Sequence, residues 1–215
     1  MKNMLYKEIK LVTHPTTLIF LSLSAMMLIP NYPYYVTFFY SALGIFFMCL
    51  NGRENHDIFY TMTLPIRKKD IVKGRFLFVI AVELVQLLAA IPFALIRRTF
   101  TIPDNEVGIE ANIAFFGLSL IMLGLFNLVF FTRYYKDPNK VGFSFALSSI
   151  IIAVYMILAE TSVHVIPFMR DCIDTKDPQF LFPKLIFLTA GIIIYICTTY
   201  LGYRKSIKLF VALDL

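Results

Sequence analysis

Six long apolar stretches divide this 215-residue chain and restrict its fold more than any other feature. The stretches are Thr16–Ile29, Tyr34–Leu50, Phe76–Ile96, Ala111–Thr132, Val141–Glu160 and Pro183–Tyr203. A helix needs about 20 apolar residues to cross a bilayer, and the stretches approach that length. Only 16% of the residues are charged, against about a quarter in a soluble domain. The sequence therefore predicts an all-α membrane protein with six transmembrane helices in one domain, residues 1–215.

The segment before the first stretch, "MKNMLYKEIKLV", mixes apolar residues with Lys and Glu at close spacing. This pattern is typical of a helix that lies in the headgroup region of a bilayer. His14-Pro15 should end it, because a proline disfavours helical geometry in the residue before it. We therefore expect an N-terminal interfacial helix.

The distribution of Lys and Arg predicts the orientation. If the N-terminus is cytoplasmic, five of the 20 basic residues fall on the outer side: Arg97, Arg98, Arg170, Lys176 and Lys184. The other fifteen fall in four segments on the inner side, so both termini are assigned to the cytoplasm. Because these residues are scattered over membrane-edge segments and do not form one soluble face, no nucleic-acid partner is predicted.

The longest cytoplasmic connection lies between the second and third stretches. In "ENHDIFYTMTL", Ile58, Phe59 and Met62 fall within one apolar arc of a helix, with Asp57 and Thr61 mostly away from it. Pro65 should end this helix at Leu64. The following "IRKKDIVKGR" is the densest basic cluster in the chain. The segment thus combines a short amphipathic helix, a proline corner and a basic helix entry. It could lie on lipid, or it could dock on a protein groove.

This segment resembles the cytoplasmic segment of ABC-2 type transporter permeases, which has a Glu, a Leu-Pro and basic residues before the third span. Here the matching residues are Glu54, Leu64-Pro65 and residues 67–75. The six spans, the interfacial helix and the length are similar too. One departure is Arg67, which stands where the family often has a helix-capping Ser or Thr and should weaken that cap by about 1 kcal/mol.

The resemblance implies that this segment is a coupling helix that docks on a separate cytoplasmic ABC ATPase. The implied docking residues are Glu54, Asp57, Ile58, Phe59, Met62, Leu64 and Pro65. Arg67, Lys68 and Lys69 would contact the ATPase or lipid phosphates, and Lys73 and Arg75 would anchor the third span at the headgroups. It further implies a bacterial plasma-membrane exporter of hydrophobic or amphipathic cargo, such as peptide toxins, antimicrobial peptides or antibiotics, built from two permease subunits.

Catalytic and metal-binding patterns are missing from the sequence. There is no phosphate-binding G-x-x-x-x-G-K-[ST] loop, so we expect ATP and Mg²⁺ only on the partner ATPase and no cofactor on this chain. The three His residues have no metal-ligand spacing. Two outer loops carry three acids each, at residues 104–110 and 171–177, but their spacing does not match a calcium loop. Neither a catalytic residue nor a metal ligand is predicted.

Polar residues within the spans are the remaining candidates, because an ionisable group in lipid usually faces a cavity or a partner. Glu83 lies within the third span, Gln86 is three residues further on, and Asn127 lies in the fourth. Glu83 could act in the translocation path or its gating, or it could make a structural hydrogen bond to Asn127.

Two other functions stay open from the sequence. The first alternative is the substrate-capture subunit of an energy-coupled vitamin importer, which has a similar size and number of spans. That class would bind a small molecule in an outer pocket and would not need a long cytoplasmic docking segment. The second alternative, an intramembrane enzyme, lacks a catalytic constellation.

Overall fold

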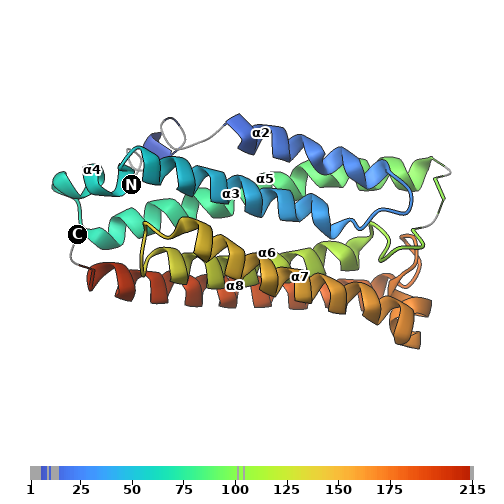
Figure 1. The fold of residues 1–215 in the computed structure, drawn as a ribbon. Coiled ribbons are helices and arrows are strands. Elements are labelled where there is room, and N and C mark those ends of the chain that lie inside the picture. The colour runs from blue at the N-terminus through green and yellow to red at the C-terminus, as the bar shows by residue number, and fades with distance from the viewer. Residues whose placement is uncertain (1–5, 9, 11–14, 101, 104, 214–215) are drawn as a thin grey trace.

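The computed structural model describes residues 6–8, 10, 15–100, 102–103 and 105–213, and most of this part is helical (Figure 1). The elements are α2 (Pro15–Ser22), the 3-10 helix η2 (Leu23–Leu28), α3 (Tyr35–Glu54), α4 (Asp57–Thr63), α5 (Lys68–Thr99), α6 (Ile113–Tyr134), α7 (Val141–Val165), the π-helix η3 (Met169–Ile173) and α8 (Leu181–Val211). Five of them, α3, α5, α6, α7 and α8, are long and apolar enough to cross a membrane. The predicted helical membrane fold is confirmed for this part of the chain.

The first apolar stretch forms α2 followed by η2, and not one continuous α-helix. At about 1.5 Å per residue in α2 and about 2.0 Å in η2, the pair extends for about 24 Å, less than the roughly 30 Å of a hydrocarbon core. The sixth span therefore stays a prediction. The expected interfacial helix falls largely outside the described residues, although Tyr6–Glu8 and Lys10 belong to them.

The bundle has two distinct ends (Figure 1). The short helix α4 lies at one end together with the last turns of α8, and the segment that joins α5 to α6 lies at the other. The Nζ atom of Lys68, at the start of α5, donates to the carbonyl oxygen of Leu213 at 2.5 Å. Arg97 and Arg98 lie in the last turn of α5, at the opposite end. Lys68 thus lies at one end and Arg97 and Arg98 at the other, and which end faces the cytoplasm stays a prediction.

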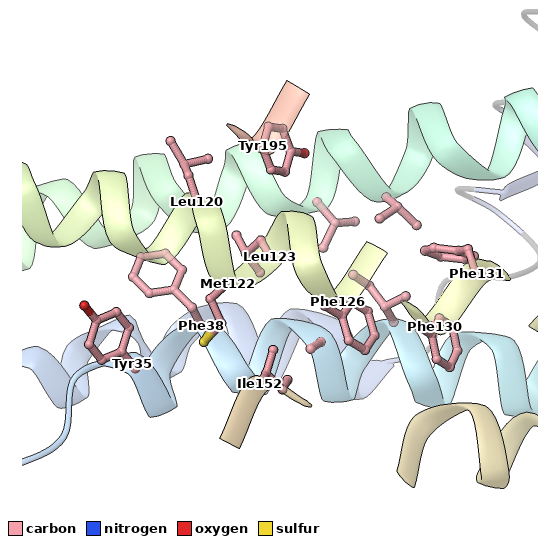
Figure 2. Packing of buried hydrophobic residues seen from close by; sticks show 14 of the residues in the cluster. Tyr35, Phe38, Leu120, Met122, Leu123, Phe126, Phe130, Phe131, Ile152 and Tyr195 are labelled. Carbon is pink, nitrogen blue, oxygen red and sulfur yellow. The ribbon is translucent and has the colours of Figure 1, made fainter. Parts of the chain in front are cut away.

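Helix α6 lies at the centre of the bundle and supplies more of the buried aromatic residues than any other helix. Phe126, Phe130 and Phe131 of α6 are buried, and the rings of Phe126 and Phe130 stack at 4.9 Å between centroids (Figure 2). Helix α8 packs directly along α6 because both carry glycine at the contact. A Cβ atom on Gly191 would come within 2.2 Å of the carbonyl oxygen of Gly117. This close approach brings polar side chains of α6 and α8 within hydrogen-bonding distance, as membrane helices with small interfacial residues allow.

Candidate functional site

Helix α4, at one end of the bundle (Figure 1), is the predicted short helix before the proline corner. It begins at Asp57 after His56, whose φ of 50° turns the chain sharply away from α3. It ends at Thr63, and Leu64 is extended with ψ of 153°. This geometry is what Pro65 imposes on the residue before it. The predicted short helix and proline corner are therefore present.

The two faces of α4 differ from the predicted arc. Phe59 and Tyr60 are 62% and 63% exposed, and Leu64 is 37% exposed. Ile58 and Met62 are partly buried and pack against the core of the bundle. The exposed apolar surface of α4 is thus an aromatic pair plus Leu64. Tyr60 was not predicted as a docking residue, although an aromatic residue adjacent to Phe59 could have indicated that role.

Asp57 and Thr61, which were predicted to lie mostly away from the apolar arc, form a polar face of α4 that packs against the bundle. Thr61 is fully buried. Its hydroxyl accepts a hydrogen bond from Lys7 Nζ at 2.7 Å and donates one to the carbonyl oxygen of Asp57 at 2.7 Å. The side chain of Asp57 is only 12% exposed. Both residues face the bundle because their partners are charged or polar groups of other segments.

Asp57 belongs to a cluster of four charged residues, here called the ion cluster: Lys7, Glu8, Asp57 and Arg75. Asp57 lies 2.6 Å from Lys7 Nζ and 2.8 Å from Arg75 Nη2, and Arg75 Nε lies 2.8 Å from Glu8 Oε2. Burial raises the pKa of Glu8, and the positive charges of Arg75 and Lys7 act in the opposite direction. The cluster joins the N-terminal segment, α4 and α5. Two positive groups balance two carboxylates, as a buried site requires.

Arg75 therefore does not have the role that the resemblance implied. Its side chain is 2% exposed and is held by two carboxylates, so it is not available to lipid headgroups. The physical reason is that Arg75 lies on the face of α5 that packs inward, whereas Lys73 lies on the exposed face. Glu8, which completes the cluster, lies in a segment that the sequence pattern assigned to lipid.

The other predicted docking residues differ in their contacts. Glu54 is paired with the adjacent Arg53 at 2.5 Å, and Arg67 is paired with Asp70 at 2.9 Å. Arg67 makes no side-chain cap at the start of α5, in line with the departure noted above. Lys68 is bonded to Leu213, whereas Lys69 and Pro65 are exposed.

The polar residues of the spans form a second cluster, between α5, α6 and α8. Glu83 is fully buried, and its Oε2 atom accepts hydrogen bonds from Tyr195 Oη at 2.6 Å and from Asn127 Nδ2 at 3.0 Å. Asn127 Nδ2 also donates to Thr199 Oγ1 at 3.3 Å. The predicted contact between Glu83 and Asn127 is therefore present. Tyr195 and Thr199 were missed, because nothing near them in the sequence points to a partner 112 positions away.

Gln86 does not join the Glu83 cluster. Its Nε2 atom donates to the Ser24 hydroxyl at 2.9 Å and connects α5 to η2. Glu83 and Gln86 share one arc of α5, but they contact different neighbours on either side of it. The three candidates for the translocation path are thus all buried, and each makes a hydrogen bond to another helix.

Polar contacts also organise the opposite end of the bundle. Arg97 Nε lies 3.0 Å from Glu110 Oε2, and Arg97 Nη2 donates to the Pro103 carbonyl oxygen at 2.6 Å. Asp177 accepts from Lys184 Nζ at 3.0 Å. Among the residues described, no group of three or more His, Cys, Asp or Glu is placed to hold a metal ion.

Two cavities lie along the contact between α5 and α8, here called the seam. One, of about 470 Å³, lies at the Arg97 end and is lined by residues from α5, α6, α8 and the connection before α8. The other, of about 330 Å³, lies nearer to α4 and is lined by residues that include Phe76 and Tyr195. Along α5, Glu83 falls between the residues that line the two cavities. The hydrogen bond between Glu83 and Tyr195 therefore crosses the seam between them.

The chain belongs to the ABC-2 family of transporter proteins, whose model matches residues 3–211. No curated protein and no solved structure matches it. Permeases of this family are multi-pass membrane components of ABC transporters and work with an ATPase subunit that is a separate component. With its apolar helices, the chain is a multi-pass membrane protein and a permease of this kind.

Proposed function

We propose that this chain is the permease subunit of an ATP-driven exporter in the bacterial plasma membrane, that it pairs with a second permease, and that α4 is the element on which the ATPase docks. The observation that carries this proposal is the two-sided character of α4. One face exposes an aromatic pair at the end of the bundle, and the other face is ion-paired to α5.

The exposed face of α4 suits a protein partner. Large aromatic residues contribute much of the binding energy when they are buried in a pocket of a partner, and a short amphipathic helix is a common element for insertion into a groove. Phe59 and Tyr60 supply the aromatic surface, and Lys69 nearby supplies exposed positive charge. ATP and Mg²⁺ would bind to the ATPase and not to this chain.

The buried face of α4 suits the transmission of force. If the ATPase displaces α4, the pair between Asp57 and Arg75 carries the displacement to α5. Helix α5 holds Glu83, which is hydrogen-bonded to α6 and α8. A shift of α5 would therefore strain or break these bonds and change the seam between α5 and α8. This route connects ATP binding with a gating role for Glu83.

The cargo we propose is hydrophobic or amphipathic, for example a peptide toxin, an antimicrobial peptide or an antibiotic. The cavities on the seam are lined mainly by apolar residues, in accord with such a cargo. The family membership supports this function over the substrate-capture subunit of a vitamin importer. The positive-inside distribution supports cytoplasmic termini and places α4 on the side of the ATPase.

The test is binding of the ABC ATPase that works with this permease. Replacement of both Phe59 and Tyr60 by alanine should weaken the complex by roughly 2 kcal/mol, or about thirtyfold in Kd, because aromatic anchors dominate such interfaces. Binding would be measured with both purified proteins in detergent. ATP hydrolysis stimulated by the permease should fall in parallel.

A matched control is Phe182→Ala, because Phe182 is 76% exposed but lies in the first turn of α8, at the other end of the bundle. This variant should bind the ATPase as the parent does. If the Phe59 and Tyr60 variant also binds normally, while it remains folded, α4 is not the docking element.

A further inference from the structure

The 470 Å³ cavity at the Arg97 end combines an apolar body with a charged rim. Its volume lies within the roughly 300–1,000 Å³ of small-molecule sites. Leu87, Phe116, Leu120 and Leu188 form part of the apolar wall. Ile91 is 41% exposed, so the cavity reaches the surface of the bundle. In the membrane, such a cavity would be open to an acyl chain from the side.

Carboxylates of the rim already have partners. Glu110 accepts from Arg97 and from the Asn105 amide, the latter at 2.6 Å. Asp177 accepts from Lys184 Nζ and from the Ile113 amide at 3.1 Å. Glu110 is therefore paired within the lining itself, by Arg97, whereas Asp177 is paired with Lys184, which does not line the cavity.

Positive groups outnumber negative ones among the lining residues: Arg97, Arg98 and Lys176 against Glu110 and Asp177. Arg97 is 2% exposed, and its Nη1 atom is buried and makes no hydrogen bond within the described part of the chain. Its guanidinium lies 5.1 Å from the centre of the Tyr34 ring, which offers a π face but no acceptor oxygen. Because the Nη1 atom of Arg97 is buried, the positive charge that a ligand can contact directly at the rim is that of Arg98, which is exposed and can bind an anionic oxygen.

We propose that this cavity binds an amphiphile with an anionic head group, either a carboxylate or a phosphate, and holds one hydrocarbon chain. The head group lies at Arg98, with the buried Arg97 behind it, and the hydrocarbon chain follows the apolar wall between α5, α6 and α8. The hydrogen bond between Glu83 and Tyr195 lies beyond Leu87 along α5 and limits the depth of the site. This proposal stands on the cavity alone and holds whether or not the chain exports this ligand.

The chain contains no Trp, which allows a direct test. Leu95 lines the cavity and is 53% exposed, so Leu95→Trp places a single fluorophore at the site. Brominated dodecanoate quenches a nearby Trp, and brominated dodecanol is the uncharged comparison. Val165→Trp is the control for partition into detergent, because Val165 is 69% exposed at the end of α7 and does not line the cavity.

We expect the acid to quench the Leu95→Trp variant at a lower concentration than it quenches the Val165→Trp variant, and the alcohol to show no such difference. Arg98→Gln, in the Leu95→Trp background, should raise the half-quenching concentration of the acid about fivefold, because it removes an exposed charge from the head-group site. Arg170→Gln, which removes a cation that does not line the cavity, should change it little. Equal quenching of the two Trp variants, or equal response to acid and alcohol, would overturn the proposal.

Reconstitution separates the two sources of such a ligand. If nanodiscs of phosphatidylglycerol abolish quenching by the acid while nanodiscs of phosphatidylcholine do not, the site takes a membrane phospholipid. If the acid quenches equally in both, the site takes a free amphiphile from solution.

Discussion

Arg75 is the residue on which the ion cluster depends, and Arg75→Met tests that dependence. Methionine keeps much of the apolar stem but leaves Glu8, which is fully buried, and Asp57 without the guanidinium. Removal of one partner from a buried ion pair costs about 3–5 kcal/mol. Because Lys7 stays 2.6 Å from Asp57, we expect the lower end, about 3 kcal/mol. At about 2–4 °C per kcal/mol for a chain of this size, Tm should fall by about 6–12 °C.

The assay uses Cys49, which is buried next to Arg75, with 3.9 Å between Sγ and Nη1. With Cys172 and Cys197 replaced by serine, a thiol-reactive fluorogenic dye should label the chain only as it unfolds. Lys73→Met is the matched control, because Lys73 is an exposed cation on the same helix. Substitutions at such exposed positions usually change stability by less than about 0.5 kcal/mol.

A double variant gives the sharper test. Glu8→Gln combined with Arg75→Met removes both charges of one pair, and it should recover part of the lost stability because no unpaired carboxylate remains at position 8. If Arg75→Met melts within about 2 °C of Lys73→Met, or if the double variant shows no recovery, Arg75 is not held in a buried ion cluster.

Two further predictions concern the membrane interior. Tyr195→Phe removes the 2.6 Å hydrogen bond to Glu83 and should lower the free energy of unfolding by about 1–2 kcal/mol, measured by the same thermal assay. If the bond also gates the seam, cargo transport in proteoliposomes should change more than the melting temperature does. An unchanged melting temperature would contradict the contact. Gly191→Ala should destabilise the chain by about 1–3 kcal/mol or more, because the added methyl group meets backbone atoms of Gly117 and not a flexible side chain. Gly142→Ala is the control and should be neutral or stabilising, because its methyl group meets nothing within 4 Å. Equal effects of the two substitutions would refute the close contact of α6 and α8.

Much of the short helix and its proline corner could be predicted from local sequence. Pro65 restricts Leu64 whatever the rest of the chain does, so the end of α4 follows from two adjacent residues. The faces of α4 could not be predicted in the same way. A helix of seven residues has too few positions for its periodicity to tell which side is covered, and Asp57 is turned inward by Lys7 and Arg75, which lie in other segments.

The Glu83 cluster illustrates the same limit inside the membrane. The cost of a buried carboxylate predicts a cavity or a partner for Glu83, and Asn127, the candidate partner, is in contact with it. Tyr195 could not be chosen from the many hydroxyl groups of the chain, because its position depends on how closely α8 approaches α6. That distance is set by the contact between Gly117 and Gly191.

Composition and local sequence were enough to predict a helical membrane protein, its apolar segments, the proline corner and a partner for Glu83, because these depend on residue type and on neighbouring residues. Which charges meet, which face of α4 is exposed and where the cavities lie became known from the folded chain. Those features depend on contacts between residues far apart in the sequence, and the packing of helices against one another creates them.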